Sequence, residues 1–237
     1  IARGVDVGGA GDQGIMVGYA TSATESLVPR EYELARNLCQ EIFKVHPYDG
    51  KVQVTVSSQE NEKIECVVAS FQNSKSSELE ELVRSLITAE QYLINPAGEW
   101  QQGGFDADSG LSGRKLVVDA YGPHVPIGGG SFSGKDATKV DRSGAYYARK
   151  VAVDLLEKSK SNGKSAQEVL VKIAYAIGVV EPVMAVAYID GIEIDISKDY
   201  DFSPRVVCKL LELDKPQFTS LSEWGHFGRE NKWDRPF

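Results

Sequence analysis

Apolar residues in the first half of the chain follow the spacing of alternating helices and strands. A stripe at three- and four-residue intervals predicts an amphipathic helix over residues 31–45. Strict alternation predicts a half-buried strand at 51–57, and a second strand follows at 64–71. Ser77 and Glu80 have the spacing of a capping box, which predicts that a second helix begins there. The short strand QYLIN completes this half, before the turn-forming sequence NPAG.

The second half contains a similar series of elements. The sequence KLVVDAY predicts a leading strand, and a helix is predicted at about 142–158. A last helix is expected after Ser203 and Pro204, which have the residue types typical of an N-cap and a first helical position. Between the two helices the apolar pattern predicts three strands, at residues 168–178, 183–189 and 192–197.

The two halves therefore indicate an internal duplication of an α+β unit with the order strand, helix, strand, strand, helix. We divide the chain into a first repeat, residues 1–101, and a second repeat, residues 102–237. Each sheet is expected to be covered by helices on one face. The other sheet face is expected to pack against another repeat or another subunit.

Composition and charge narrow the class of protein. The chain has 237 residues, of which 42% are hydrophobic and 25% charged, as is typical of a globular protein with a substantial core. No apolar run is long enough to span a membrane, and no secretory signal is present, so we expect a cytoplasmic protein. The three scattered cysteines are expected to be buried thiols in a reducing compartment. A net charge of −8 argues against a general nucleic-acid binder.

The segment GGGSFSGKD, residues 128–136, is the strongest chemical signal. From Gly129 it fits part of the phosphate-binding P-loop pattern, but Asp136 stands where a Ser or Thr would hold magnesium. The residues alone leave three explanations: a P-loop, a flexible surface loop, and a different phosphate cradle with Asp141 as a metal ligand. We favour the cradle, because a basic island marks a site for one small polyanion in an acidic chain. This island consists of Arg114, Lys115, Lys135, Lys139 and Arg142.

Four other motifs each have an ordinary structural explanation. GGAGDQG, residues 8–14, can be a structural turn, and YDGK, residues 48–51, a turn with a solvated charge pair. DADSGLSGRK, residues 106–115, lacks the remaining ligands and the terminal Glu of a calcium loop. WGHFGRE, residues 224–230, can be a packed aromatic tail. Each motif is ambiguous by itself.

In combination these motifs resemble one family. GAGDQG, GLSGRK, GGGSFSGKDATKVDRS, YAIGVVEP and GHFGRE occur in the order and spacing of S-adenosylmethionine synthetases. The resemblance covers nearly the whole chain and corresponds to the family's central and C-terminal repeats. The family's three-repeat α+β architecture accounts for the two repeats found here. Its N-terminal repeat, with a GHPDK segment, is not among the 237 residues, which also lack an initial Met, so we expect a processed, cut or partially recorded product.

The resemblance implies a methionine adenosyltransferase. In that family the sulfur of L-methionine attacks C5′ of ATP, and the released tripolyphosphate is hydrolysed to phosphate and pyrophosphate. The resemblance also implies two Mg²⁺ ions per site, a K⁺ ion, and a homodimer with active sites between subunits, which can form a dimer of dimers. The alternative is a non-catalytic or regulatory subunit of the same fold, and a P-loop kinase or ATPase is disfavoured by Asp136.

The resemblance further assigns roles to individual residues. Three cations, Arg114, Lys135 and Lys139, would be catalytic, and Asp141 would bind metal. Asp12 would lie on an interface loop near the active site. Methionine would be bound by Asp108, Lys139 and Ile177. ATP would be contacted by Asp49, Lys51, Trp100, Asp108, Arg114, Lys115, Ser131 and Lys135. The family's catalytic His belongs to the absent segment, so His46, His124 and His226 inherit no catalytic role.

Overall fold

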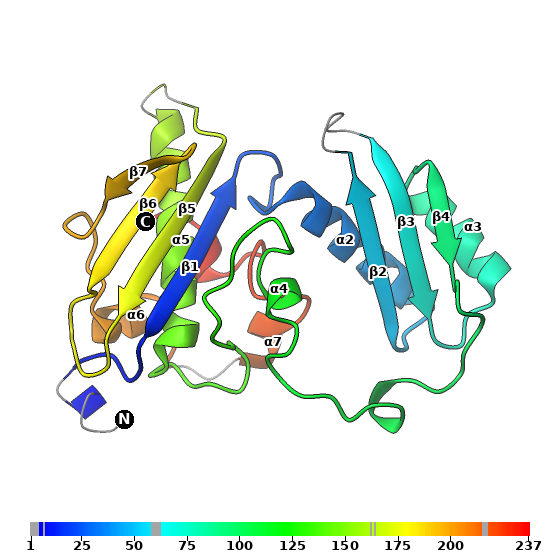
Figure 1. The fold of residues 1–237 in the computed structure, drawn as a ribbon, viewed down its shortest axis with the longest axis horizontal. Helices are drawn as coiled ribbons and strands as arrows, with labels where there is room; N and C mark the ends of the chain where they lie inside the picture. The colour runs from blue at the N-terminus through cyan, green and yellow to red at the C-terminus, as the bar shows by residue number, and fades with distance from the viewer. Residues whose placement is uncertain (1–4, 7, 58–62, 162, 164, 215–217) are drawn as a thin grey trace. The chain divides into compact units, whose positions relative to one another are not determined.

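The computed structural model describes residues 5–6, 8–57, 63–161, 163, 165–214 and 218–237 (Figure 1). Its contacts divide the chain into two compact units. The large unit combines Ile1–Pro29 with Ser112–Phe237, and the small unit is Arg30–Leu111. These units are spatial, whereas the predicted boundary between residues 101 and 102 concerns sequence repeats and stays a prediction.

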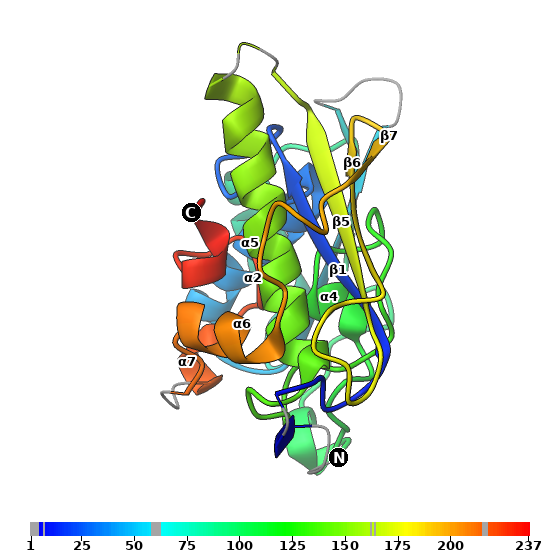
Figure 2. The same cartoon turned by 90° about the vertical axis from the view of Figure 1, so that its left-hand side faces the viewer.

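The large unit contains a four-stranded antiparallel sheet in the order β1-β5-β6-β7. β1 (Gly14–Thr21) was not predicted, and it pairs along its whole length with β5 (Glu168–Tyr175). β6 (Met184–Ile189) and β7 (Ile192–Asp195) complete the sheet. α5 (Val140–Ser161) runs along one face of this sheet, as Figure 2 shows. A strand from the first thirty residues of the chain thus forms one edge of the sheet in the large unit.

α5 lies at the centre of the large unit, and 15 of its 22 residues are buried. A Cβ atom at Gly18 of β1 would lie 2.0 Å from the backbone of Ala148, so the helix packs directly on the strand. The opposite side of α5 contacts the C-terminal η2 (Lys232–Asp234). Two short helices, α6 (Pro204–Leu210) and α7 (Phe218–Ser222), precede η2.

A buried ion pair connects α5 to the C-terminal η2. The guanidinium of Arg149 is fully buried and contacts the carboxylate of Asp234 at 2.9 Å. It also donates hydrogen bonds to the carbonyl oxygens of Tyr19, Ser26 and Leu27. Because every arm of this guanidinium has a partner, its burial is compensated and α5 has one fixed position.

The small unit has two layers. Its sheet has the order β2-β3-β4, in which β2 (Gly50–Val56) and β3 (Ile64–Phe71) are antiparallel and β4 (Gln91–Ile94) is parallel to β3. α2 (Arg30–Val45) and α3 (Ser76–Leu86) cover one face of the sheet. The core between these layers consists of Leu38, Ile42, Val67, Ala69, Phe71, Leu79 and Val83.

The predicted fold class is confirmed, since the chain forms two sheets with helices packed on them. Ser203 and Pro204 also occupy their predicted positions at the start of α6. Packing of the open sheet faces against a repeat or a subunit stays a prediction. No helix in the described part of the chain combines the length and the apolar character needed to cross a bilayer.

Two local predictions are wrong. KLVVDAY forms the short helix α4 (Leu116–Asp119) instead of a strand, because its backbone N–H groups bond back to Lys115 and Leu116 while Tyr121 stacks on Phe227 at 4.5 Å. Tertiary packing overrides the β propensity of its valines. The capping box at Ser77 is also absent, since α3 begins at Ser76, whose N–H donates to the Glu99 carboxylate at 2.8 Å.

The cysteines are free thiols that are half-buried rather than fully buried. The thiol of Cys208 donates to the carbonyl oxygen of Ala137 at 2.9 Å. Burial raises the pKa of Cys208 to about 11 and also raises the pKa of Cys39. These two thiols are therefore protonated at neutral pH.

Candidate functional site

The large unit brings several predicted site residues to one end of its sheet. Gly14 at the start of β1 pairs with Tyr175 at the end of β5, and α5 begins at Val140. A Cβ atom at Gly14 would lie 3.8 Å from the carboxylate of Asp141, so the start of β1 and the start of α5 are close together. The glycine-rich loop, residues 128–136, reaches the same place.

Glycine is required in this loop because its backbone passes very close to its neighbours. A Cβ atom at Gly128 would lie 1.8 Å from the carbonyl oxygen of Ile15, and one at Gly130 would lie 2.1 Å from an Asp141 carboxylate oxygen. Both distances are far shorter than any contact a side chain can make. The backbone of the loop therefore packs directly against both β1 and the first turn of α5.

This loop is not a P-loop in its structural context. The element before it is the helix α4, whereas a P-loop follows a buried parallel strand, and the nearby sheet is antiparallel. Asp136 has a different task as well. Its carboxylate accepts hydrogen bonds from the N–H, at 2.8 Å, and the hydroxyl of Thr138, and these bonds lower the pKa of Asp136. Asp136 thus stabilises the turn that leads into α5.

A tight turn presents Lys135. The N–H of Lys135 donates to the carbonyl oxygen of Phe132 at 3.3 Å, and Gly134 has a φ of 83°, which favours glycine. Phe132 is buried, and the buried guanidinium of Arg142 donates to the carbonyl oxygen of Lys135 at 2.8 Å. The backbone of Lys135 is therefore held from both sides.

The ammonium of Lys135 pairs with the carboxylate of Asp141. Their side chains are only 29% and 13% exposed, so solvent screens this pair weakly. Lys139 lies directly before α5, where its ammonium donates to the Thr138 hydroxyl at 3.1 Å and is 3.7 Å from the Asp136 carboxylate. The cations of Lys135 and Lys139 and the mostly buried carboxylate of Asp141 thus lie at the N-terminal end of α5.

The GLSGRK motif contacts the glycine-rich loop. A Cβ atom at Gly113 would lie 2.5 Å from the Cβ of Ser131, and the Ser112 hydroxyl donates to the carbonyl oxygen of Ser133 at 3.3 Å. Arg114 and Lys115 follow directly and are exposed. Because the two motifs touch, the segments that carry Arg114, Lys115 and Lys135 lie close together.

The GGAGDQG motif lies beside YAIGVVEP. Ala10 forms a parallel bridge with Ile177, its N–H donates to Val179 at 2.9 Å, and its carbonyl oxygen accepts from Gly178 at 2.8 Å. The side chain of Ile177 is exposed, and the Asp12 carboxylate accepts the N–H of Gln13 at 2.8 Å. The loops of Asp12 and Ile177 therefore form one structure within the large unit.

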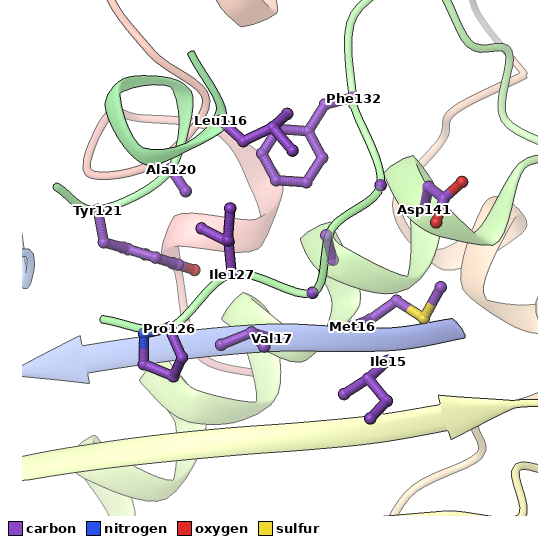
Figure 3. A pocket seen from close by; sticks show the side chains of 13 residues that line it. Ile15, Met16, Val17, Leu116, Ala120, Tyr121, Pro126, Ile127, Phe132 and Asp141 are labelled. Carbon is purple, nitrogen blue, oxygen red and sulfur yellow. The ribbon is translucent and has the colours of Figure 1, made fainter. Parts of the chain in front are cut away.

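A mainly apolar pocket lies under the glycine-rich loop (Figure 3). Leu116 and Phe132 lie on one side of it, β1 contributes Met16 and Val17, and the Asp141 carboxylate lies at one end. Asp141 is the only charged residue among the described residues that line it. Such an apolar floor lowers the local dielectric constant and strengthens the field of nearby charges.

The other predicted residues, Asp49, Lys51, Trp100 and Asp108, belong to the small unit. A Cβ atom at Gly103 would lie 2.7 Å from the Trp100 ring and 3.0 Å from the Cβ of Asp49, so these two residues are brought together. The Asp49 carboxylate accepts the N–H of Gly104 at 2.9 Å. The Asp108 carboxylate closes the next turn by accepting from Gly110 at 2.9 Å, while Lys51 lies exposed on β2.

Gln72 joins these segments and was missed by the sequence analysis. Its side-chain oxygen accepts the N–H of Asp49 at 3.3 Å, and its nitrogen donates to the carbonyl oxygen of Gln101 at 2.8 Å. No motif contains Gln72, and its only sequence signal is its place at the end of a predicted strand. Arg142 was assigned to the basic island for a small polyanion, but it is buried and its guanidinium donates to the loop backbone.

Asp141 is the residue whose surroundings fit a cation. The described part of the chain contains no group of three His, Cys, Asp or Glu side chains that could enclose a metal. Mg²⁺ does not need such a cage, because it is usually held by one or two carboxylates together with phosphate oxygens and water. The Asp141 carboxylate already has an ammonium as its partner, so its position suits a positive charge.

Comparisons with known proteins agree with the motifs. A family model described as S-adenosylmethionine synthetase, central domain, matches residues 7–100, and one for the C-terminal domain matches residues 102–235. The S-adenosylmethionine synthase of Nitratiruptor sp. is 41% identical over 266 residues, covering 97% of this chain and 68% of that protein. The Thermus thermophilus enzyme of the same name is 41% identical over 254 residues, covering 93% and 63%.

A solved structure, described as an unusual S-adenosylmethionine synthetase from Campylobacter jejuni, matches with a TM-score of 0.82 and 31% identity. The match covers 96% of this chain and 69% of that chain. The chain thus spans 68% of the length of the Nitratiruptor protein and 63% of that of the Thermus thermophilus protein. Both domain models and the fold agree, and the chain belongs to the S-adenosylmethionine synthetase family.

Proposed function

We propose that the protein containing this chain is a methionine adenosyltransferase, which forms S-adenosylmethionine from ATP and L-methionine. The observation that carries this proposal is the cluster at the start of α5, where the glycine-rich loop presents Lys135 beside Asp141 and contacts the GLSGRK motif. The proposal includes L-methionine contacts by Asp108, Lys139 and Ile177, and cytoplasmic localisation. It also includes a homodimer with active sites at the subunit interface, which can assemble into a dimer of dimers.

The proposed reaction transfers an adenosyl group. A sulfur lone pair of methionine forms a bond to C5′ of ATP while the C5′–O bond breaks, and the electron pair of that bond leaves with tripolyphosphate. The product is a sulfonium ion. Water then attacks a phosphorus atom of tripolyphosphate, which yields phosphate and pyrophosphate. The first step moves negative charge onto the leaving oxygen, so groups that stabilise this charge accelerate it.

The cations of the large unit are suited to this step. Lys135 and Lys139 extend from the entrance to α5, and Arg114 and Lys115 follow the motif that touches the loop. Ser131 lies at the contact between the two motifs and places loop backbone near the same charge. Since the backbone that carries Lys135 is held before substrate arrives, only side chains need to reorient when charge develops.

Asp141 is proposed as the magnesium ligand, and a K⁺ ion is proposed to support the site. When bound, Mg²⁺ would neutralise part of the negative charge of the phosphate groups. In the structure the ammonium of Lys135 pairs with the Asp141 carboxylate. Binding of tripolyphosphate and a divalent ion would break this ion pair, and the Lys135 ammonium would then contact phosphate.

The residues of the small unit are proposed to bind the nucleoside part of ATP. Trp100 supplies an aromatic face next to Asp49, and Asp108 and Lys51 supply charge on neighbouring segments. Asp12 is proposed to lie on a loop at the subunit interface.

The test is product analysis with the intact polypeptide. We expect S-adenosylmethionine, phosphate and pyrophosphate in equal amounts from ATP and L-methionine, measured by mass spectrometry and phosphate assays. Norleucine, which has a methylene group in place of sulfur, is the matched control and should give no adenosyl product. Product that appears only after a complete family subunit is added would indicate a regulatory subunit, and phosphate transfer without methionine would contradict the proposal.

A further inference from the structure

The GHFGRE motif contains a residue that the proposed chemistry does not use. His226 is 1% exposed, and all of its polar atoms have partners. Its N–H donates to the carbonyl oxygen of Asp119 at 3.0 Å, and its carbonyl oxygen accepts from the Trp233 indole at 2.7 Å. Its ring nitrogens contact the Tyr146 hydroxyl at 2.6 Å and the Ser133 hydroxyl at 3.2 Å.

Three of these partners belong to the three segments that carry the phosphate-site residues. Asp119 ends α4, which begins directly after Arg114 and Lys115. Ser133 lies in the turn that presents Lys135. Tyr146 lies on α5, whose first turn contains Asp141. One imidazole from the end of the chain thus connects the segments on which the cations depend.

The ring is suited to this bridging position. A neutral imidazole has one donor and one acceptor nitrogen, and a hydroxyl can serve as the partner of either. Burial and the nearby charges of Arg142 and Arg229 lower the pKa of His226 to about 4, so the ring is neutral at physiological pH. Burial raises the pKa of Tyr146 to about 12, so the phenol keeps its proton.

Aromatic packing keeps the bridge in place. Phe132 contacts the His226 ring edge-on with a centroid distance of 5.0 Å, and Trp233 stacks on Tyr146 at 3.9 Å. The contact with Ser133 is the hydrogen bond between the His226 ring and the glycine-rich loop. Loss of this hydrogen bond would therefore loosen the loop without removing any of these rings.

We propose that His226 is a positioning residue, which holds the Phe132–Lys135 turn through Ser133 and so fixes the direction of Lys135 toward tripolyphosphate. The inference rests on the proposed function. It assigns to the C-terminal motif a role in phosphate binding, beyond packing. Arg142 supplies a second attachment through the carbonyl oxygen of Lys135, so removal of the histidine loosens the turn rather than unfolding it.

The experiment measures binding of inorganic tripolyphosphate with Mg²⁺ to the intact protein by calorimetry, together with kcat and KM. We expect Ser133→Ala and His226→Gln each to weaken tripolyphosphate binding by about three- to tenfold, as for one lost hydrogen bond. We expect kcat to fall by a similar factor while KM for methionine changes little. The double variant should lose less than the product of the single effects, because both changes remove one contact.

His124→Ala is the matched control, since this exposed histidine belongs to the same unit and its loss should leave tripolyphosphate binding unchanged. If His226→Gln does not fold, Ser133→Ala and Tyr146→Phe carry the test. Wild-type binding by both Ser133→Ala and Tyr146→Phe would overturn the proposal and leave His226 as a packing residue. Failure of the wild-type protein itself to bind tripolyphosphate would overturn the proposed function, and this inference with it.

Discussion

The two groups of predicted site residues are held in different ways. The glycine-rich loop of the large unit is attached by buried side chains, since Arg142 and His226 are each no more than 2% exposed. The loop at 100–110 in the small unit is held by exposed hydrogen bonds, one accepted by the Asp49 carboxylate and one donated by the Gln72 amide. Buried polar contacts are stronger and more costly to lose than exposed ones.

This difference agrees with the part of the substrate that each group is proposed to bind: tripolyphosphate in the large unit and the nucleoside in the small unit. Groups that stabilise a developing negative charge must already be oriented, because reorientation during the reaction would cancel the electrostatic gain. Groups that bind a nucleoside face the same ligand before and after the reaction, and so can adapt to it. We therefore expect substitutions in the large unit to have the larger effects.

The largest effect is expected from removal of the buried guanidinium of Arg149 in α5. Arg149→Ala would leave the Asp234 carboxylate buried without its partner, at a cost of about 3–5 kcal/mol in the free energy of unfolding. Urea unfolding measures this cost. Lys44→Ala in the exposed pair with Glu41 is the control, and its effect should be below about 1 kcal/mol. A similar loss in the free energy of unfolding for both variants would contradict the expectation that buried contacts contribute more than exposed ones.

Charge removal at the loop should affect turnover rather than folding. Lys135→Ala and Asp141→Asn are each expected to lower kcat by about 10²–10³, the usual loss for one electrostatic contact in a transition state. Steady-state kinetics with ATP and methionine check this. Lys160→Ala, at the far end of the same helix, should keep normal turnover. Wild-type turnover in either active-site variant would count against the assignment.

Acid should destabilise the large unit through His226. The folded pKa of about 4 lies below the ordinary value of 6.5, so the unfolded chain binds the proton more readily and stability falls as the pH drops below 6.5. The loss between pH 7 and pH 5 is about 2 kcal/mol from this group. Urea unfolding of wild-type and His226→Gln proteins at both pH values measures it, and an equal pH dependence in the two would refute it.

The smallest effect is expected in the small unit. Gln72→Ala removes two exposed hydrogen bonds and should raise KM for ATP by about three- to tenfold with little change in kcat. Gln53→Ala, an exposed amide on β2, is the control and should behave like the wild type. A loss in kcat as large as that of Lys135→Ala would mean that the nucleoside segment is as preorganised as the phosphate loop.

Sequence patterns predicted most elements, because periodicity reports which face of an element is buried. They missed β1, whose glycines and small residues give a weak pattern and whose partner β5 lies more than a hundred residues later. In its place the nearby KLVVDAY was assigned as the leading strand, although it forms the helix α4. Local propensity could not show that a distant segment takes this position.

The candidate site was predicted as far as its motifs extend. The family resemblance located Lys135, Asp141 and the other charged residues, and the contact between Gly113 and Ser131 explains why two of the motifs occur together. The attachments by His226, Arg142 and Gln72 could not be predicted, because each depends on which segments meet in three dimensions. A histidine in a glycine-rich tail gives no sign that it will be buried against a serine 93 residues away.

The pairing of β1 with β5 has a consequence for synthesis on the ribosome. The small unit is one continuous stretch of chain and can fold as soon as residues 30–111 have emerged. The large unit has to wait, since β1 needs a neighbour made much later and α5 also contacts Asp234 and Phe237. Until translation reaches that point, β1 is a nascent edge strand without its partner, and this is the interval in which a chaperone would be most useful.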